Sequence, residues 1–136
     1  MPVLDTEVLF ALNPRDRKHN AALKVLSEIR KKSKEILVPD TVIFEFQIIL
    51  KSIVKEPLTI KAAILALRRA IEINGGKEVR TMDSDLIMRQ CEIEERYGLT
   101  YFDSLIAASV LKLDGEIISD DKAFSRIPGI HRIPLL

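Results

Sequence analysis

The chain has 136 residues, of which 47% are hydrophobic and 30% charged, and its net charge is +1. This length suits one hydrophobic core, so we expect a single domain spanning residues 1–136. The near-neutral charge predicts no general electrostatic attraction to nucleic acid. One cysteine and two distant histidines exclude an internal disulfide and a thiolate zinc site, so any bound metal would need oxygen ligands.

Neither a secretion signal nor a membrane span is indicated. The first residues, MPVLDTEVLF, lack a basic segment and reach an acid at residue 5. The longest strongly apolar segment, VIFEFQIIL at 42–50, is too short to cross a bilayer and contains a glutamate. We therefore expect a cytoplasmic protein with no membrane contact.

Short apolar runs alternate with helix-length segments along the chain. The runs PVL, EILV, EVRTM, EIIS and HRIPLL predict strands at 2–4, 35–38, 78–82, 116–119 and 131–136. Helical patterns occupy 19–32, 41–54, 60–73, 83–98 and 100–113. Asp40 or Thr41 is the predicted N-cap of the second of these helices, and Gly75-Gly76 ends the third. Asp83 caps the fourth, and Gly98 ends it. Such alternation predicts an α/β fold with a mostly parallel sheet.

Acidic residues stand at places where a purely structural role competes with a functional one. Asp5 directly follows the first strand, where it could cap a helix or face the crevice at the carboxyl edge of a parallel sheet. Glu45 points 120 to 160° away from the polar stripe of its helix, a rough estimate from 3.6 residues per turn, and therefore faces inward. An inward carboxylate needs a cation, a hydrogen-bond donor or a metal.

Three further aspartates lie at a helix start and a strand end. Asp103 follows Thr100 by three residues, a spacing typical of a capping box, yet it also lies at the mouth of the core. Asp120 and Asp121 follow the run EIIS, where either could cap a short turn. A parallel sheet could bring all four places to one edge, and clustered carboxylates suit Mg²⁺ or Mn²⁺, which in pairs can hold a phosphodiester for attack by water.

These segments together resemble a known family. The runs VLDTEVLFAL, VIFEF, YFDSLIAASVLKLDGEIISDDKAF and IPGIHRI resemble the PIN domain, especially the single-domain ribonucleases of the VapC toxin type, from Pro2 to the C-terminus. The resemblance implies a three-layer α/β/α sandwich and an Mg²⁺- or Mn²⁺-dependent endoribonuclease. It also implies that the partners are RNA and an antitoxin that covers the acidic site.

Matched motif by motif, the resemblance assigns catalytic and metal-binding roles to Asp5, Glu45, Asp103 and Asp121, with Asp120 as an auxiliary acid or an alternative ligand. It implies supporting hydrogen bonds from the side chains of Thr6 and Ser119. Glu7 departs from the family pattern, which often has asparagine there.

The remaining surface suggests partners and leaves alternatives open. Basic residues at 15–34 and at Arg68 and Arg69 are candidates for contacting RNA phosphates, although a solvated helix face explains them as well. The apolar content of 42–54 and 60–71 predicts a homodimer. The alternatives are a non-catalytic PIN-like module that binds RNA or protein, and phosphotransfer through an aspartyl-phosphate, for which a second aspartate would be expected where Glu7 stands.

Overall fold

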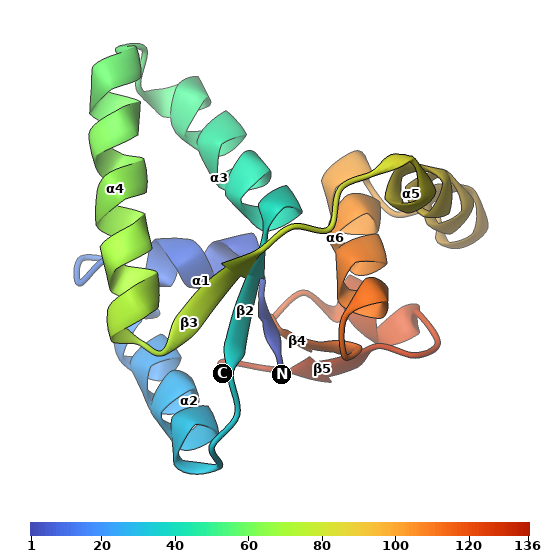
Figure 1. Ribbon diagram of the computed structural model, residues 1–136, viewed down its shortest axis with the longest axis horizontal. Helices are drawn as coiled ribbons and strands as arrows, with labels where there is room; N and C mark the ends of the chain where they lie inside the picture. The colour runs from blue at the N-terminus through green and yellow to red at the C-terminus, as the bar shows by residue number, and fades with distance from the viewer.

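The computed structural model describes all residues from 1 to 136 and contains one parallel sheet (Figure 1). Its strands are β1 (Val3–Leu4), β2 (Ile36–Pro39), β3 (Gly76–Val79), β4 (Glu116–Ile118) and β5 (His131–Ile133). They lie in the order β3-β2-β1-β4-β5, and every neighbouring pair is parallel. The predicted α/β class with a mostly parallel sheet is confirmed.

The five predicted helices are present near their expected positions, and the structure adds the short helix α1 after Asp5. The helices are α1 (Thr6–Ala11), α2 (His19–Lys31), α3 (Asp40–Ile53), α4 (Pro57–Ile73), α5 (Ser84–Tyr97) and α6 (Tyr101–Lys112), followed by the 3-10 helix η1 (Lys122–Arg126). Asp83 caps α5 by accepting the N–H of Leu86 at 2.8 Å, and Gly98 ends the helix with φ +65°. Both signals for this helix were therefore correct.

Two local predictions near Asp40 were wrong. Strand β3 begins at Gly76 and ends at Val79, so Arg80–Met82 are not part of it. Helix α3 begins at Asp40 itself, with Pro39 as N-cap. The Asp40 carboxylate instead accepts the backbone N–H groups of Thr41, Thr81 and Met82, at 3.0 to 3.1 Å. These bonds turn the chain away from the sheet after β3, a side-chain alternative to strand pairing.

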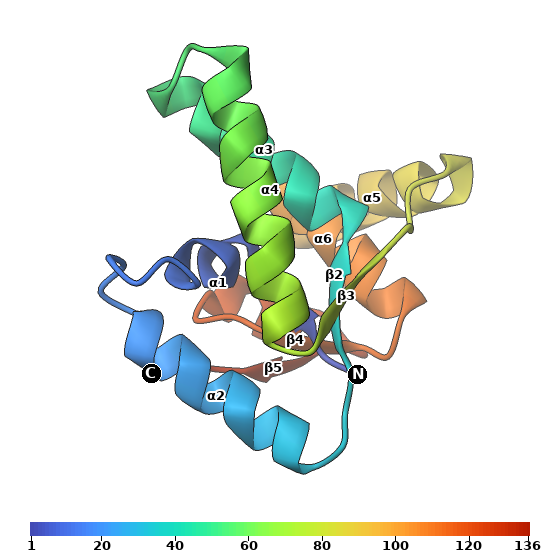
Figure 2. The same cartoon turned by 60° about the vertical axis from the view of Figure 1, so that its left-hand side comes forward.

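Helices cover both faces of the sheet and make three layers. Helices α1, α2 and α4 lie on one face and α5 and α6 on the other, while α3 and α4 form a pair that projects beyond the sheet (Figures 1 and 2). Helix α6 is the innermost, since Ser104 through Val110 are all buried. No helix has both the length and the apolar content required to cross a bilayer.

From β1 the chain builds the sheet outward through β2 and β3, and it then returns to the other side of β1 with β4 and β5. This return places the ends of β1 and β4 side by side at the carboxyl edge of the sheet. Leu4 pairs with Ile118, and the Asp5 N–H donates to the Ile118 carbonyl at 3.1 Å. Ser119, the residue that follows β4, therefore lies beside Asp5. Such a reversal of the strand order opens a crevice at the ends of the strands, where α/β proteins bind ligands.

Candidate active site

Asp5 is a buried carboxylate at the end of β1, with 7% of its surface exposed. The Thr6 N–H donates to Oδ1 at 2.8 Å and the Ser119 hydroxyl to Oδ2 at 2.6 Å. Burial raises the pKa of Asp5 to about 7, the two hydrogen bonds oppose the rise, and the charges of Glu7 and Glu45 add to it. No lysine or arginine forms an ion pair with Asp5. Its hydrogen bonds orient this carboxylate, but no cation neutralises it.

Glu45, one turn into α3, is half-buried beside α1. Its carboxylate accepts a short hydrogen bond from the Thr6 hydroxyl. Burial raises the pKa of Glu45, the bond from Thr6 partly offsets this, and the charge of Asp103 raises it further. Glu45 has no basic partner, so the salt bridge considered as a structural role for it does not form.

Asp103 lies half-buried in the first turn of α6. The Thr100 hydroxyl accepts the Asp103 N–H at 3.2 Å and so caps the helix. The reciprocal bond of a capping box, from the Thr100 N–H to the Asp103 carboxylate, is not formed. Burial and then the charge of Asp121 raise the pKa of Asp103. Thr100 therefore supplies the cap, and the Asp103 carboxylate has the charge of another acid, Asp121, acting on it.

The two aspartates after β4 have different environments. Asp121 is exposed, accepts the Ala123 N–H at 2.9 Å, and caps η1. The carboxylate of Asp120 accepts the N–H groups of Leu135 and Leu136 on Oδ1 and the Lys18 ammonium on Oδ2 at 2.8 Å. Burial raises its pKa, but these donors outweigh that effect and hold the pKa of Asp120 below its usual range. Asp120 is thus engaged in structural contacts, whereas Asp121 keeps one carboxylate oxygen without a hydrogen bond.

Asp5, Glu45, Asp103 and Asp121 form a series in which each charge acts on the next. Glu45 raises the pKa of Asp5, Asp103 raises that of Glu45, and Asp121 raises that of Asp103. The side chains as they stand do not bring three acidic, histidine or cysteine groups close enough to hold an ion. The donor set still fits a hard divalent cation, because its ligands are carboxylate oxygens and a cation would relieve the repulsion among them.

Lys18, on the segment between α1 and α2, is a contact that sequence reasoning did not identify. Its ammonium lies 2.8 Å from Asp120 and 3.4 Å from Glu7. Glu7 also accepts the Asp120 backbone N–H. In the sequence Lys18 is one of several basic residues between 15 and 34, and nothing in its spacing connects it with an acid more than a hundred residues away.

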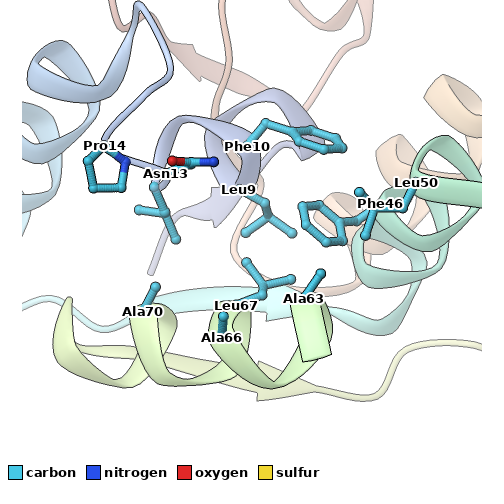
Figure 3. A pocket seen from close by; sticks show the side chains of 11 residues that line it. Leu9, Phe10, Asn13, Pro14, Phe46, Leu50, Ala63, Ala66, Leu67 and Ala70 are labelled. Carbon is cyan, nitrogen blue, oxygen red and sulfur yellow. The ribbon is translucent and has the colours of Figure 1, made fainter. Parts of the chain in front are cut away.

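An apolar cleft of about 500 Å³ lies between α1, α3 and α4, next to the elements that carry Asp5 and Glu45. Figure 3 shows side chains from the three helices facing one another across it, among them Phe10 and Phe46, whose rings stack at 4.5 Å. No charged residue lines this cleft. Its lining is apolar, and two of the helices that form it, α1 and α3, begin at or carry Asp5 and Glu45.

Comparison with known proteins identifies the family. The model of the PIN domain family matches residues 3–130, almost the whole chain. The chain belongs to the PIN domain family. No curated protein sequence matches it.

Several solved structures have a similar fold, and their descriptions name VapBC, VapC or toxin-antitoxin proteins. VapBC2 from Rickettsia felis bound to a promoter DNA fragment has a TM-score of 0.69 at 17% identity, covering 97% of this chain and 96% of that chain. DNA-bound VapBC from Salmonella typhimurium has a TM-score of 0.68 at 14% identity, with full coverage of both chains. VapC20 of Mycobacterium tuberculosis, a toxin that cleaves the sarcin-ricin loop, has a TM-score of 0.64 at 20% identity, covering 93% and 94%. The resemblance to the PIN domain and its α/β/α sandwich is confirmed.

Proposed function

We propose that this PIN domain is an Mg²⁺- or Mn²⁺-dependent endoribonuclease of the VapC type. The observation that carries the proposal is that Asp5, Glu45 and Asp103, from three separate segments, are buried or half-buried, have raised pKa values and have no basic partner. Uncompensated carboxylates at the mouth of a core destabilise a fold, and perturbed acids in a crevice are typical of functional sites. Membership of the PIN domain family agrees with a nuclease.

In this proposal the chain's own residues hold the ions and fix the ligands. Asp5, Glu45, Asp103 and Asp121 are the ligands, and Asp120 remains auxiliary because its oxygens are already hydrogen-bonded. Ser119 orients Asp5, and Thr6 orients Glu45, through the hydrogen bonds described above. Bound Mg²⁺ or Mn²⁺ would supply positive charge that activates water and offsets the charge developing on the scissile phosphate.

We further propose an antitoxin as protein partner. The structures of similar fold from Rickettsia felis and Salmonella typhimurium are VapBC assemblies, and that from Klebsiella pneumoniae is a toxin-antitoxin complex. The apolar cleft between α1, α3 and α4 offers a surface for an apolar segment, and the carboxylates next to it attract a basic side chain. A partner segment that combines both would cover the site and block RNA.

Cleavage of a labelled RNA tests the function. The purified protein should produce discrete fragments with Mg²⁺ or Mn²⁺, stop when EDTA removes the ion, and recover when the ion is restored in excess. Cleavage that persists in EDTA would contradict the proposed metal dependence. Binding of RNA without cleavage under all metal conditions would favour the non-catalytic alternative.

We also propose that two copies associate through α3 and α4. Apolar side chains remain exposed on this pair, including Phe44 at 39%, Ile53 at 71% and Leu58 at 77%. Exposed apolar side chains that form a large contiguous patch mark interaction sites. Light scattering at micromolar concentration should give twice the 15.4 kDa chain mass, and a mass equal to one chain would rule the dimer out.

A further inference from the structure

Glu7 introduces a fifth acid beside the carboxylate series, and the fold compensates for it with one cation. Glu7 is half-buried, and its charge raises the pKa of Asp5. The ammonium of Lys18 lies between Glu7 and Asp120, and only 17% of the Lys18 side chain is exposed. Its hydrogen bond to Asp120 and its attraction to both carboxylates raise the pKa of Lys18 despite partial burial, so it stays charged.

The contacts around Lys18 fix the backbone between Ser119 and Asp121. The Asp120 N–H donates to Glu7, and the Asp121 N–H donates to the Ser119 hydroxyl at 3.0 Å. That same hydroxyl donates to Asp5 at 2.6 Å. One turn of chain therefore carries both the donor that orients Asp5 and the carboxylate of Asp121.

We propose that Lys18 is a positioning residue that holds the Ser119–Asp121 turn in the arrangement required for metal binding, by bridging Glu7 and Asp120. This inference depends on the proposed function, because it names a residue that supports the same site. Without the ammonium, Glu7 and Asp120 repel each other at close range. The hydrogen bond from the Asp120 N–H to Glu7 then breaks, and the turn that contains Ser119 and Asp121 becomes mobile.

The bridge also explains how the chain tolerates glutamate at position 7. The long Glu7 side chain reaches the backbone of the turn after β4, and one of its oxygens accepts from Asp120 while the other faces Lys18. Without Lys18, the negative charge of Glu7 would be added to the site with no cation to offset it. Glu7 and Lys18 act as a pair, so their substitutions should not be additive.

The test compares Lys18→Met with Lys18→Arg. Amide hydrogen exchange is measured on the metal-free protein, and Mn²⁺ affinity is measured by titration. Lys18→Met removes the charge and keeps the aliphatic stem, whereas arginine can bind both carboxylates. Lys18→Met should speed amide hydrogen exchange of Asp120 and Asp121 in the metal-free protein, while the Leu37 amide in β2 is unchanged. It should also weaken Mn²⁺ binding by about tenfold or more, as loss of a support for metal ligands does.

Two further variants make the test specific. Glu7→Gln combined with Lys18→Met should recover part of the Mn²⁺ affinity, because glutamine still accepts the Asp120 N–H without repelling its carboxylate. Lys112→Met is the matched control, since Lys112 bridges the Asp83 carboxylate and the Thr81 carbonyl and contacts none of the site acids. It should leave both readouts at the wild-type level.

Each outcome decides between the proposals. Unchanged exchange at Asp120 and Asp121 in Lys18→Met overturns the positioning role whatever the activity. Faster exchange with unchanged Mn²⁺ affinity also overturns it, because the lysine would then support only the fold. Failure of the wild-type protein to bind Mn²⁺ overturns the proposed function itself, and a wild-type affinity retained by Lys18→Arg supports the account.

Discussion

Asp103→Asn is expected to reduce RNA cleavage on the order of 100-fold or more, the loss typical when a main electrostatic contributor to a transition state is removed. Asparagine keeps the shape and one oxygen but loses the charge needed to hold a divalent cation. The metal-free variant should be as stable as wild type or more stable at neutral pH, because burial and the charge of Asp121 both disfavour an ionised Asp103. Cleavage rates and denaturant unfolding of the same preparations measure both effects.

The structure separates this expectation from a capping role. Thr100, not Asp103, provides the side-chain bond at the start of α6, so the cap survives in Asp103→Asn. If Asp103 served only the helix terminus, the variant would lose about 0.3 to 1 kcal/mol of stability and cut RNA normally. Asp85→Asn is the control, since Asp85 is an exposed acid in the first turn of α5. Its cleavage should equal that of wild type.

The stability of the metal-free protein should fall as pH rises from about 4 to about 7. The pKa of Asp5 is raised from 3.8 to about 7, so in this window the folded state binds a proton that the unfolded state has released. A proton bound only by the folded state makes stability decrease with pH. At about 1.4 kcal/mol per pH unit, the rise in pH from about 4 to about 7 corresponds to a loss of about 4 kcal/mol.

Denaturant unfolding at about pH 5 and about pH 8, with chelator present, measures this dependence. Glu45 and Asp103 change stability in the same direction, since their pKa values are also raised. Asp83 and Asp120 have lowered pKa values, so their contributions are lost only as pH falls below about 4. Asp5→Asn should flatten the curve and exceed wild type in stability at the higher pH. A steep, unaltered curve in this variant would show that Asp5 is not the responsible group.

Periodicity and strand-end position were enough to predict where Asp5 and Glu45 lie in the fold, although their role in a metal site stays a prediction. Asp5 was predicted from its place directly after an apolar run, and Glu45 from its angle to the polar stripe of its helix. Both signals are local in sequence and survive folding, because a strand end and a helix phase are fixed by a few residues. Parallel pairing of β1 with β4 then brought Asp5 beside Ser119, as the α/β class implies.

The parts that sequence did not predict depend on single contacts between distant segments. Lys18 meets Asp120 across 102 positions, and Asp40 meets Thr81 across 41. The Asp40 contact replaced the expected strand at Arg80–Met82, since its carboxylate binds the N–H groups that a strand would have used. Neither contact has a periodic signal, because each depends on how two distant segments approach in the folded chain.

Diffraction from Mn²⁺-soaked crystals, recorded for anomalous scattering, tests the site assignment most directly. The account predicts an anomalous peak enclosed by Asp5, Glu45, Asp103 and Asp121, with the side chains drawn together around it. The peak should be absent in crystals of Asp103→Asn and present in those of Asp85→Asn. A wild-type crystal in which Mn²⁺ lies elsewhere, or nowhere near these four carboxylates, would contradict the central claim.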